Sequence, residues 1–445
     1  MIIVPKNIVT VDDRERILKN HFVEINDGRI IRITKNDEKF FKKYKGDVYR
    51  FENLTLIPGF VQTHIHLCQT LFRGLADDLE LLNWLQLKIF PFENAHNKNS
   101  LLTAVRLGLN ELLLSGTTTI LDMGTLRHQE VIFEELQNSG MRAIAGKCLI
   151  DENDLFPEFK SDTKTELDEI YQLAKTYHNT SSGKVKYGFA PRFVLSCSEK
   201  LLKESFEMKK DFPGSLYHTH SSENKSEIAE VKRRHNKENI EYFDSIGVID
   251  DHSVLAHCIH VNDKETDLLK KNNVRVSHCP SSNLKLGSGI ANIPKYLSKG
   301  ISVSLGSDGA PCNNNLSIFN EMRLASLIHK PIHGATVMDA KTVFKLATIE
   351  GAKALHLQNE IGSIEVGKKA DLALLDLSTN SHSLSDDNEL IYSDIVSSST
   401  SESVDSVMVE GEWKVINKES LLYDQTELNQ YSKAELKKLL NRVKK

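Results

Sequence analysis

Histidine residues and one aspartate follow several short apolar runs of this chain. The run 54–66 ends in His64 and His66, and a spacing of two puts both imidazoles on one face of a strand. His220 on a later run and Asp308 on the last one complete a set of imidazole and carboxylate donors that suits Zn²⁺ or Fe²⁺. We therefore predict one divalent metal ion, Zn²⁺ with Fe²⁺ as the alternative, held by these four residues.

Two further residues are placed to move protons at such a metal. Glu223 follows His220 in the sequence His-Ser-Ser-Glu, and this spacing can place its carboxyl over the attacking water. The same spacing favours His220 over His218 as the ligand. The alternative for Glu223 is an acidic residue at a helix N-terminus, where the helix dipole favours one. His257, which ends the next run, is a candidate to orient or deprotonate the water.

Short β-rich runs alternate with helix-like stretches between residues 54 and 309, which predicts βα units and a parallel sheet. Eight units in about 250 residues predict an α/β fold built on a (β/α)8 TIM-type barrel. A doubly wound open sheet is the alternative. The barrel is favoured because the active-site residues of such barrels lie at the carboxyl ends of the strands, and the histidines and Asp308 are found at these positions. The runs are 54–66, 116–123, 141–150, 184–192, 215–222, 253–259, 274–280 and 301–309.

Both ends of the chain are predicted to form a small β domain beside the barrel. Asp27-Gly28 and Glu410-Gly411 are hairpin signals within apolar alternation, and strands with glycine turns are expected over 360–373. Residues 374–403 are rich in Ser, Asp and Asn and are predicted to form a loop. The Lys-rich tail is predicted to be a solvated surface helix. The resulting division is a composite β-sandwich domain over 1–57 and 360–425, a metal-dependent hydrolase barrel over 58–359, and a helical tail over 426–445.

The composition is that of an ordinary soluble globular protein, with 40% hydrophobic and 26% charged residues and a net charge of −5. It shows no basic stripe for nucleic acid, and its apolar runs are shorter than the about 20 residues that cross a membrane. No signal peptide is visible at the N-terminus. The six cysteines form no C-x-x-C pair, which is typical of a reducing cytoplasm. We expect a cytoplasmic protein whose partner is a small-molecule substrate.

Taken together, the motifs resemble the amidohydrolase superfamily, and more narrowly its Trz/Atz-type branch, which contains the 5′-methylthioadenosine/S-adenosylhomocysteine deaminases. This resemblance implies a barrel with a composite β-sandwich and one Zn²⁺ or Fe²⁺, and it allows a homo-oligomer. It further implies that Asp308 is both ligand and proton acceptor, that Glu223 protonates a ring nitrogen, and that His257 orients the water. The residues that carry it are Pro58-Gly59, His64-x-His66, His220-x-x-Glu223, His257, His278-x-Pro280-x-Ser282-Asn283, Ser307-Asp308-Gly309 and 367–372.

The resemblance also extends to a substrate pocket. In adenosine-type deaminases a tryptophan lines the base and ribose pocket and a glutamate accepts hydrogen bonds from ribose hydroxyls; Trp84 and Glu93 match in type and spacing. The alternatives are a helix-core anchor for Trp84 and a surface charge for Glu93. His278 is expected to make a substrate contact or a structural hydrogen bond, with a catalytic role as the alternative.

Two positions depart from the pattern of these deaminases. Arg192 stands where they often have histidine on the fourth strand, and Lys147 is the nearest match to an arginine that often contacts the substrate tail. An arginine at this place could pair bidentately with a carboxylate or a phosphate-like group. The 5′ substituent, or even the base, can therefore differ from the substrates for which the family is named.

The function that follows is hydrolytic deamination of an adenosine-like nucleoside, of the 5′-deoxyadenosine, 5′-methylthioadenosine or S-adenosylhomocysteine type, to the inosine analogue and ammonia. One alternative is an aminohydrolase or chlorohydrolase of another ring, such as aminodeoxyfutalosine, 8-oxoguanine or an s-triazine. An alternative of another class is a metal-binding relative without catalysis.

Overall fold

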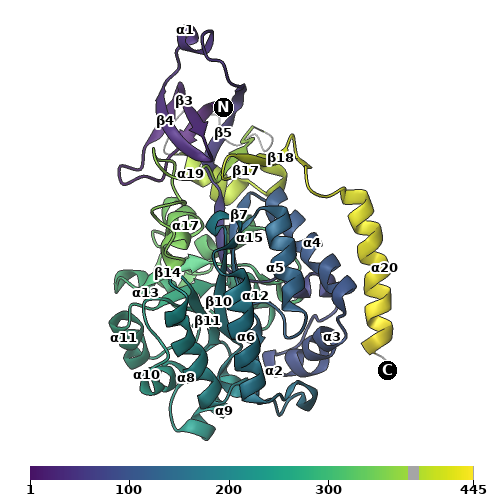
Figure 1. Ribbon diagram of the computed structural model, residues 1–445. Helices are drawn as coiled ribbons and strands as arrows, with labels where there is room; N and C mark the ends of the chain where they lie inside the picture. The colour runs from purple at the N-terminus through teal and green to yellow at the C-terminus, as the bar shows by residue number, and fades with distance from the viewer. Residues whose placement is uncertain (379–389, 444–445) are drawn as a thin grey trace.

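The strands of the protein fall into two sheets in the computed structural model, which describes residues 1–378 and 390–443 (Figure 1). One sheet has ten strands in the order β14-β13-β12-β11-β10-β8-β7-β6-β15, with β9 beside β10. The other has nine strands and draws on both ends of the chain. Figure 1 shows this second sheet at one end of the molecule, in the purple of the N-terminus and the yellow-green of the C-terminal region.

The ten-stranded sheet is the predicted (β/α)8 barrel. Its neighbouring strands pair in parallel, and the pairing of β15 with β6 closes the ring. Each of the eight sequence runs therefore supplies a barrel strand, with the third run divided into β8 and β9 and the eighth into β14 and β15. The bounds are β6 (Phe60–His66), β7 (Thr117–Asp122), β8 (Arg142–Ala145), β9 (Cys148–Leu149), β10 (Val185–Pro191), β11 (Leu216–Ser221), β12 (Ser253–His257), β13 (Arg275–His278), β14 (Ser302–Leu305) and β15 (Asp308–Gly309).

The division of the eighth strand positions Asp308. At Gly306 a Cβ atom would lie 2.6 Å from the carbonyl oxygen and 2.8 Å from the amide nitrogen of His64, so only glycine allows so close an approach to β6. After this close passage β15 pairs with β6 at Ile65 and His66. The strand that carries Asp308 is thereby held against the strand that carries the two histidines.

Helices cover the outside of the barrel (Figure 1). In α4 the buried residues Leu101, Val105 and Leu109 recur every fourth position and so form one apolar face, and the side chain of Asn97 caps the helix start. The longer helices are α4 (Lys98–Leu114), α5 (Gln129–Ser139), α6 (Thr163–Tyr177), α8 (Glu199–Met208), α9 (Lys225–His235), α10 (Asn239–Ile246), α11 (Asp263–Lys271), α15 (Ile318–Leu327) and α17 (Ala340–Leu346). The short ones that matter for the site are η1 (Leu67–Phe72), α2 (Leu81–Trp84), α3 (Phe90–Asn94), α12 (Pro280–Lys285) and α14 (Ala310–Asn313).

The second sheet joins the two chain ends through β5, which pairs in parallel with β1 and antiparallel with β16. A shared apolar core takes one residue each from β1, β3, β5, β16 and β17, namely Ile3, Val23, Leu56, Leu372 and Met408. The predicted hairpins at Asp27-Gly28 and Glu410-Gly411 are confirmed. The bounds are β1 (Ile2–Val9), β2 (Ile17–Lys19), β3 (His21–Asn26), β4 (Arg29–Lys35), β5 (Val48–Pro58), β16 (Leu372–Leu375), β17 (Val404–Val409), β18 (Glu412–Ile416) and β19 (Glu419–Ser420).

The prediction of one strand over 54–66 is wrong, because the chain changes sheets at Gly59. Residues 54–58 end β5 in the second sheet, and β6 begins at Phe60. A Cβ at Gly59 would lie 2.2 Å from Oγ1 of Thr118, so the chain can cross here only at glycine. The amide of Gly59 donates to the carbonyl of Asp371 over 2.9 Å, which fixes the crossing.

Other sequence predictions need smaller changes. Of the strands expected over 360–373, the described structure has only the start of β16 at Leu372. Within the loop predicted for 374–403, residues 379–389 lie outside the described part of the chain, and Ile391–Ser393 forms a short helix, α19.

The C-terminal helix α20 (Gln425–Val443) is not simply solvated. Leu439 is fully buried in a cluster with Leu71, Phe72 and Phe92. One face of α20 therefore packs onto the segment that follows β6, and the prediction of a solvated helix is wrong for that face.

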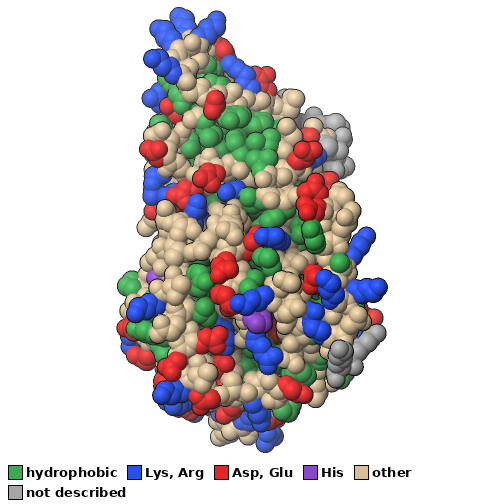
Figure 2. Space-filling model, turned by 45° about the vertical axis from the view of Figure 1, so that its right-hand side comes forward, with side chains coloured by type: hydrophobic (Ala, Val, Ile, Leu, Met, Phe, Trp, Pro, Cys, Tyr) green, Lys and Arg blue, Asp and Glu red, His purple; other side chains and the backbone are tan. Residues whose placement is uncertain are grey.

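Figure 2 shows apolar side chains gathered over the second sheet, whereas Lys, Arg, Asp and Glu side chains are interspersed over the barrel on the same face. None of the helices in residues 1–378 and 390–443 combines the length and the apolar character that a membrane crossing needs.

Candidate active site

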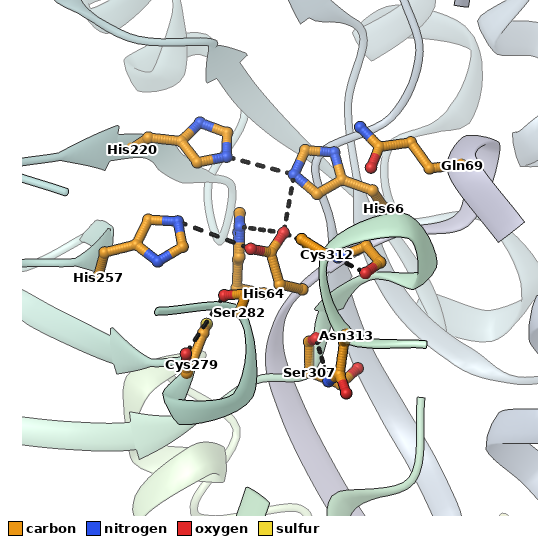
Figure 3. Close-up of polar contacts among 12 residues, drawn as sticks. His64, His66, Gln69, His220, His257, Cys279, Ser282, Ser307, Cys312 and Asn313 are labelled. Atoms are coloured by element: carbon orange, nitrogen blue, oxygen red, sulfur yellow. Dashed lines mark hydrogen bonds and ion pairs between the residues drawn. The ribbon is translucent and has the colours of Figure 1, made fainter. Parts of the chain in front are cut away.

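The ends of the first, fifth and eighth barrel strands converge on one point. His64 and His66 lie on β6, His220 on β11 and Asp308 on β15, and one ligand atom of each lies within 4.8 Å of the others. Oδ1 of Asp308 is 3.3 Å from Nε2 of His64 and 3.4 Å from Nε2 of His66. Nε2 of His66 is 3.2 Å from Nε2 of His220, and Figure 3 shows the rings pointing toward one another.

Hydrogen bonds on the outer side of the rings fix their orientation. Nδ1 of His220 donates to the backbone carbonyl of Arg192 over 2.7 Å, which leaves Nε2 for the interior. Nδ1 of His64 lies 2.8 Å from Nε2 of the buried His218. The two histidines of β11 therefore have different roles: His220 points toward the other candidate metal ligands, and His218 holds the ring of His64 in place.

The same residues fit a divalent cation. Burial, and then the neighbouring imidazoles, hold the pKa of His66 and His220 well below the ordinary value, so both rings are neutral donors at pH 7. Burial alone would raise the pKa of Asp308, but the hydrogen bond from His64 and the surrounding imidazoles bring it well below its ordinary value. Nε2 of His64 is buried and faces Oδ1 of Asp308 at 3.3 Å. Neutral imidazoles and an ionised carboxylate are the donor set that Zn²⁺ and Fe²⁺ take.

Glu223 and His257 stand on the open side of this group. Nε2 of His257 lies 3.4 Å from Oε2 of Glu223 and 3.8 Å from Oδ2 of Asp308, while Nδ1 of His257 donates to Oδ1 of Asn283 over 2.8 Å. Burial, followed by the nearby carboxylates of Asp308 and Glu227, raises the pKa of Glu223 well above its ordinary value. Burial therefore favours the protonated form of the Glu223 carboxyl, which has a proton to give.

Glu223 is not the acidic residue of a helix N-terminus. Helix α9 begins at Lys225 with Asn224 as its cap, and Glu227 completes the capping box. Glu227 accepts hydrogen bonds from the backbone amides of Glu223 at 2.8 Å and Asn224 at 3.3 Å. The cap and Glu227 together hold the backbone of Glu223, and its side chain lies in the pocket wall.

A pocket opens onto this group of side chains. Trp84 lines it, with Leu81 and Leu85 beside it from the α2 segment and Phe193 from the chain after β10. Trp84 is 5% exposed. The pocket thus has an apolar side suited to a flat ring and a polar side formed by the site residues.

Arg192, Glu93 and Gln69 form a buried ion-pair network at the wall of this pocket. Nη1 of Arg192 lies 2.8 Å from Oε2 of Glu93, and Nη2 lies 3.4 Å from Oε1. Nε2 of Gln69 donates to Oε1 of Glu93 over 2.8 Å, and the guanidinium lies 5.0 Å from the centroid of the Phe90 ring. Arg192 and Gln69 line the pocket. Glu93 lies behind them and is not part of the pocket lining found in the described residues.

Two residues predicted to bind substrate lie elsewhere. Nζ of Lys147 is buried and pairs with Glu166 and, at 3.1 Å, with Glu169 on α6. His278 is buried at the end of β13, with its ring centroid 5.6 Å from that of His329. Glu93 and His64 are also outside the pocket lining, but each contacts a lining residue, Glu93 through Arg192 and His64 through Asp308. The other predicted residues line the pocket.

Sequence reasoning overlooked the roles of several supporting residues. Gln69 carries no motif signal beyond its position three residues after His66. Asn283 belongs to a motif that the sequence shows, but its hydrogen bond to His257 appears only in the folded barrel. Glu227 could have been found from the Asn224-x-x-Glu227 capping box.

The fold and this site define the class of protein. Residues 55–414 match the amidohydrolase family, and the chain belongs to that family. It is 37% identical over 382 residues, 85% of each chain, to the 5'-deoxyadenosine deaminase of Methanobrevibacter smithii. It is 33% identical over 428 residues, 95% of each chain, to the 5-methylthioadenosine/S-adenosylhomocysteine deaminase of Bacillus cereus.

A solved structure shows the same likeness in three dimensions. The zinc-bound adenosine deaminase of Xanthomonas campestris superposes with a TM-score of 0.90 at 27% identity, covering 99% of this chain and 98% of that one. The family and these relatives make the protein a hydrolase that acts on C–N bonds other than peptide bonds.

Proposed function

We propose that the protein is a metal-dependent deaminase that converts an adenosine-like nucleoside to the inosine analogue and ammonia. One observation carries the proposal: the ends of β6, β11 and β15 bring neutral imidazoles and an ionised carboxylate together in the pocket that Glu223 lines, where burial favours the protonated form of the Glu223 carboxyl. The names of the relatives, which are 5'-deoxyadenosine deaminase and methylthioadenosine/S-adenosylhomocysteine deaminase, support the substrate class. 5′-Deoxyadenosine, 5′-methylthioadenosine and S-adenosylhomocysteine are the substrates to test.

We assign one ion, Zn²⁺, to His64, His66, His220 and Asp308. The donor set and the zinc in the Xanthomonas campestris structure support this choice over Fe²⁺. Such an ion lowers the pKa of a water molecule from ~15.7 toward ~7 and so supplies a nucleophile at neutral pH.

The side chains around this position then carry the protons. Glu223 gives its proton to ring nitrogen N1, which makes C6 more electrophilic. Asp308 accepts one proton of the attacking water and passes it to the amino group, which leaves as ammonia. The second proton of the water leaves the oxygen as C6 becomes a carbonyl and restores the acid form of Glu223. His257, held by Asn283, orients the water. Water is added and ammonia is released, so the reaction needs no other reactant.

Substrate contacts follow from the pocket wall. Trp84 is placed to lie against the ring, and Arg192, which lines the same pocket, is placed to donate hydrogen bonds. Glu93 is the predicted acceptor for ribose hydroxyls, but its carboxylate is already bonded to Arg192 and Gln69. Lys147 and His278 would act from outside the lining, by holding the strand ends on which the pocket is built.

That pairing of Glu93 favours a second candidate function. A ring without ribose, such as 8-oxoguanine or an s-triazine, or the differently substituted aminodeoxyfutalosine, would not need the Glu93 carboxylate. The chemistry would be the same displacement at an sp² carbon. A metal-binding relative without catalysis is disfavoured because each proposed proton carrier faces the site.

An ammonia-release assay on the purified, Zn²⁺-loaded protein tests the proposal. Ammonia and the inosine analogue are expected from at least one of the three nucleosides. If none reacts while another aminated ring does, the second candidate function holds. If no ring reacts at all in a sample whose metal content is confirmed by elemental analysis, the protein is a metal-binding relative without catalysis.

Other features complete the proposal. We propose a cytoplasmic protein, which is supported by six cysteines that are all free and buried. The similarity to this enzyme branch supports a homo-oligomer, which light scattering of the purified protein tests. We propose domain limits at 1–57 with 360–425, at 58–359 and at 426–445, supported by the change of sheet at Gly59 and testable by limited proteolysis.

A further inference from the structure

A second group of metal-ligating side chains lies at the amino-terminal end of the barrel, away from the candidate active site. Asp251 and His252 precede β12, whose other end carries His257, and His356 follows α18 (Ile349–Ala354). One ligand atom of each of the three residues lies within 4.8 Å of the others. The side chains of Asp251 and His252 are 50% and 36% exposed and His356 is half-buried, so a cation can reach the group from solvent.

The turn that carries Asp251 and His252 is held in place by its neighbour Asp250. The amide of Ser253 donates to the carbonyl of Asp250 over 3.0 Å, and the amide of His252 donates to Oδ1 of Asp250 over 2.9 Å. Nζ of Lys209 binds both oxygens of the same carboxylate, at 2.7 Å and 2.6 Å. Two of the three residues are therefore presented by a backbone that is already ordered, which lowers the cost of binding an ion.

His356 stands at a helix end where glycine is the usual residue. Its φ is +55°, and its amide donates to the carbonyl of Lys353 over 3.1 Å. The amide of Leu357 donates to the carbonyl of Ala352 over 2.8 Å, which completes a Schellman motif with His356 in the left-handed position. A side chain costs free energy at this position, so the helix end alone does not account for the imidazole.

Hydrogen bonds to Asp251 determine which nitrogen of each ring can bind a cation. Nε2 of His356 donates to the backbone carbonyl of Asp251 over 2.7 Å, and Nδ1 of His252 donates to the Asp251 carboxylate over 2.8 Å. The neutral rings therefore carry their lone pairs on Nδ1 of His356 and Nε2 of His252. The two rings are nearly parallel, at 11° with centroids 4.1 Å apart, much as His66 and His220 are at 13° and 5.3 Å.

The group lies beside the apolar plug that closes this end of the barrel. Leu355 and Leu357, the neighbours of His356, are buried together with Val61 of β6 and Val254 of β12. An ion shared by His356 and the turn before β12 would therefore tie the plug to a barrel strand. Residues at this end of such barrels serve stability, whereas those at the other end serve catalysis.

We propose that Asp251, His252 and His356 bind a second Zn²⁺, which stabilises the closed amino-terminal end of the barrel and takes no part in catalysis. Two imidazoles and a carboxylate are donors that Zn²⁺ takes, and water completes a four-coordinate site. The positive charge of Arg275 acts on both Asp251 and His356, so this site binds more weakly than the four-ligand group. The inference goes beyond the proposed deaminase function and does not depend on it.

Calorimetric titration of Zn²⁺ into protein whose four-ligand site is already loaded tests the inference. The wild type should bind one further equivalent per chain. His356→Asn and Asp251→Asn should each weaken this step about tenfold or more. Asparagine tolerates the left-handed backbone, so His356→Asn keeps the helix end. His128→Asn is the matched control, because His128 is also half-buried with a φ of +63° and belongs to neither candidate metal group; it should bind as the wild type does.

Thermal unfolding measures what the second ion does. Excess Zn²⁺ should raise the Tm of the wild type and of His128→Asn but leave that of His356→Asn unchanged. The inference is overturned if the wild type binds no further equivalent, if His356→Asn binds it equally well, or if binding leaves the Tm of the wild type unchanged. In His220→Ala the weaker step should persist while the tight ion is lost, so failure of the candidate active site and failure of this second site appear in different variants.

Discussion

Nδ1 of His220 donates a hydrogen bond to the backbone carbonyl of Arg192 over 2.7 Å. A residue of the metal centre is thus oriented by the main chain of a residue whose side chain forms the pocket wall. The amide of His220 also donates to this carbonyl, over 3.1 Å. Metal binding and substrate recognition meet at Arg192, but they use different parts of it.

This separation predicts that Arg192→Gln keeps its metal. The carbonyl that orients His220 survives the substitution, so elemental analysis after gel filtration should find wild-type metal content. The free energy of unfolding should nevertheless fall by about 3–5 kcal/mol, because Glu93 is left buried without its partner charge. His220→Ala is the matched comparison and should lose metal. Equal metal loss in both variants would show that the Arg192 side chain, and not its carbonyl, supports the centre.

Glu223→Gln should remove most of the activity and change its pH dependence. Burial, followed by Asp308 and Glu227, raises the pKa of Glu223, and the reaction needs its protonated form. In the wild type, kcat/KM should therefore fall as pH rises through that raised pKa. The Gln variant should lose about 10²- to 10⁴-fold in kcat and show no such alkaline limb. The surface variant Glu199→Gln should behave as wild type. A Gln variant with wild-type turnover would remove Glu223 from the reaction.

The metal site could be predicted because each ligand is recognisable from the short stretch of sequence around it. His64 and His66 are two residues apart on one strand, and each further ligand ends a run of its own, so the barrel rule alone brings them together. The network of Gln69, Glu93 and Arg192 has no such signal. Its members come from three separate segments, and each looks like an ordinary surface or pocket residue until the α2–α3 segment folds over the end of β10.

Sequence patterns did not predict the limit between β5 and β6 or the buried face of the C-terminal helix. The apolar run through Pro58 and Gly59 reads as one strand, because the sheet to which each residue belongs is decided by the contact of Gly59 with Thr118. In the tail, the lysines point to solvent. Leu439 gains its burial from Leu71 and Phe92, which lie more than 300 residues earlier in the chain.

A buried carboxyl outside the metal centre should make stability depend on pH. Glu321 is fully buried on α15, and burial raises its pKa to about 7, although Ser281 and Asn313 donate hydrogen bonds to it. Because the folded pKa lies above the unfolded value of about 4.3, the associated stability is full below about pH 4 and is lost as pH rises through about 7. The loss is about 4 kcal/mol. Urea unfolding from pH 4 to 8 should show a shallower pH dependence for Glu321→Gln than for wild type. Identical slopes would mean that Glu321 is ionised in the folded protein.

The C-terminal helix should stabilise the segment that carries the pocket wall. Leu439 is fully buried against Phe72 and Phe92, and Nε of Arg442 donates to the carbonyl of Ala95 over 2.7 Å, next to the end of α3. Leu439→Ala should lower the free energy of unfolding by about 2–5 kcal/mol, because it removes a buried side chain and leaves a cavity. It should also raise KM more than it lowers kcat, since Glu93 lies on α3 while the metal ligands lie on barrel strands. Tyr431→Ala, a large truncation at a 59% exposed position of the same helix, should change neither quantity appreciably. If Leu439→Ala and Tyr431→Ala have equal effects in urea unfolding and steady-state kinetics, the packing of Leu439 does not stabilise the pocket segment.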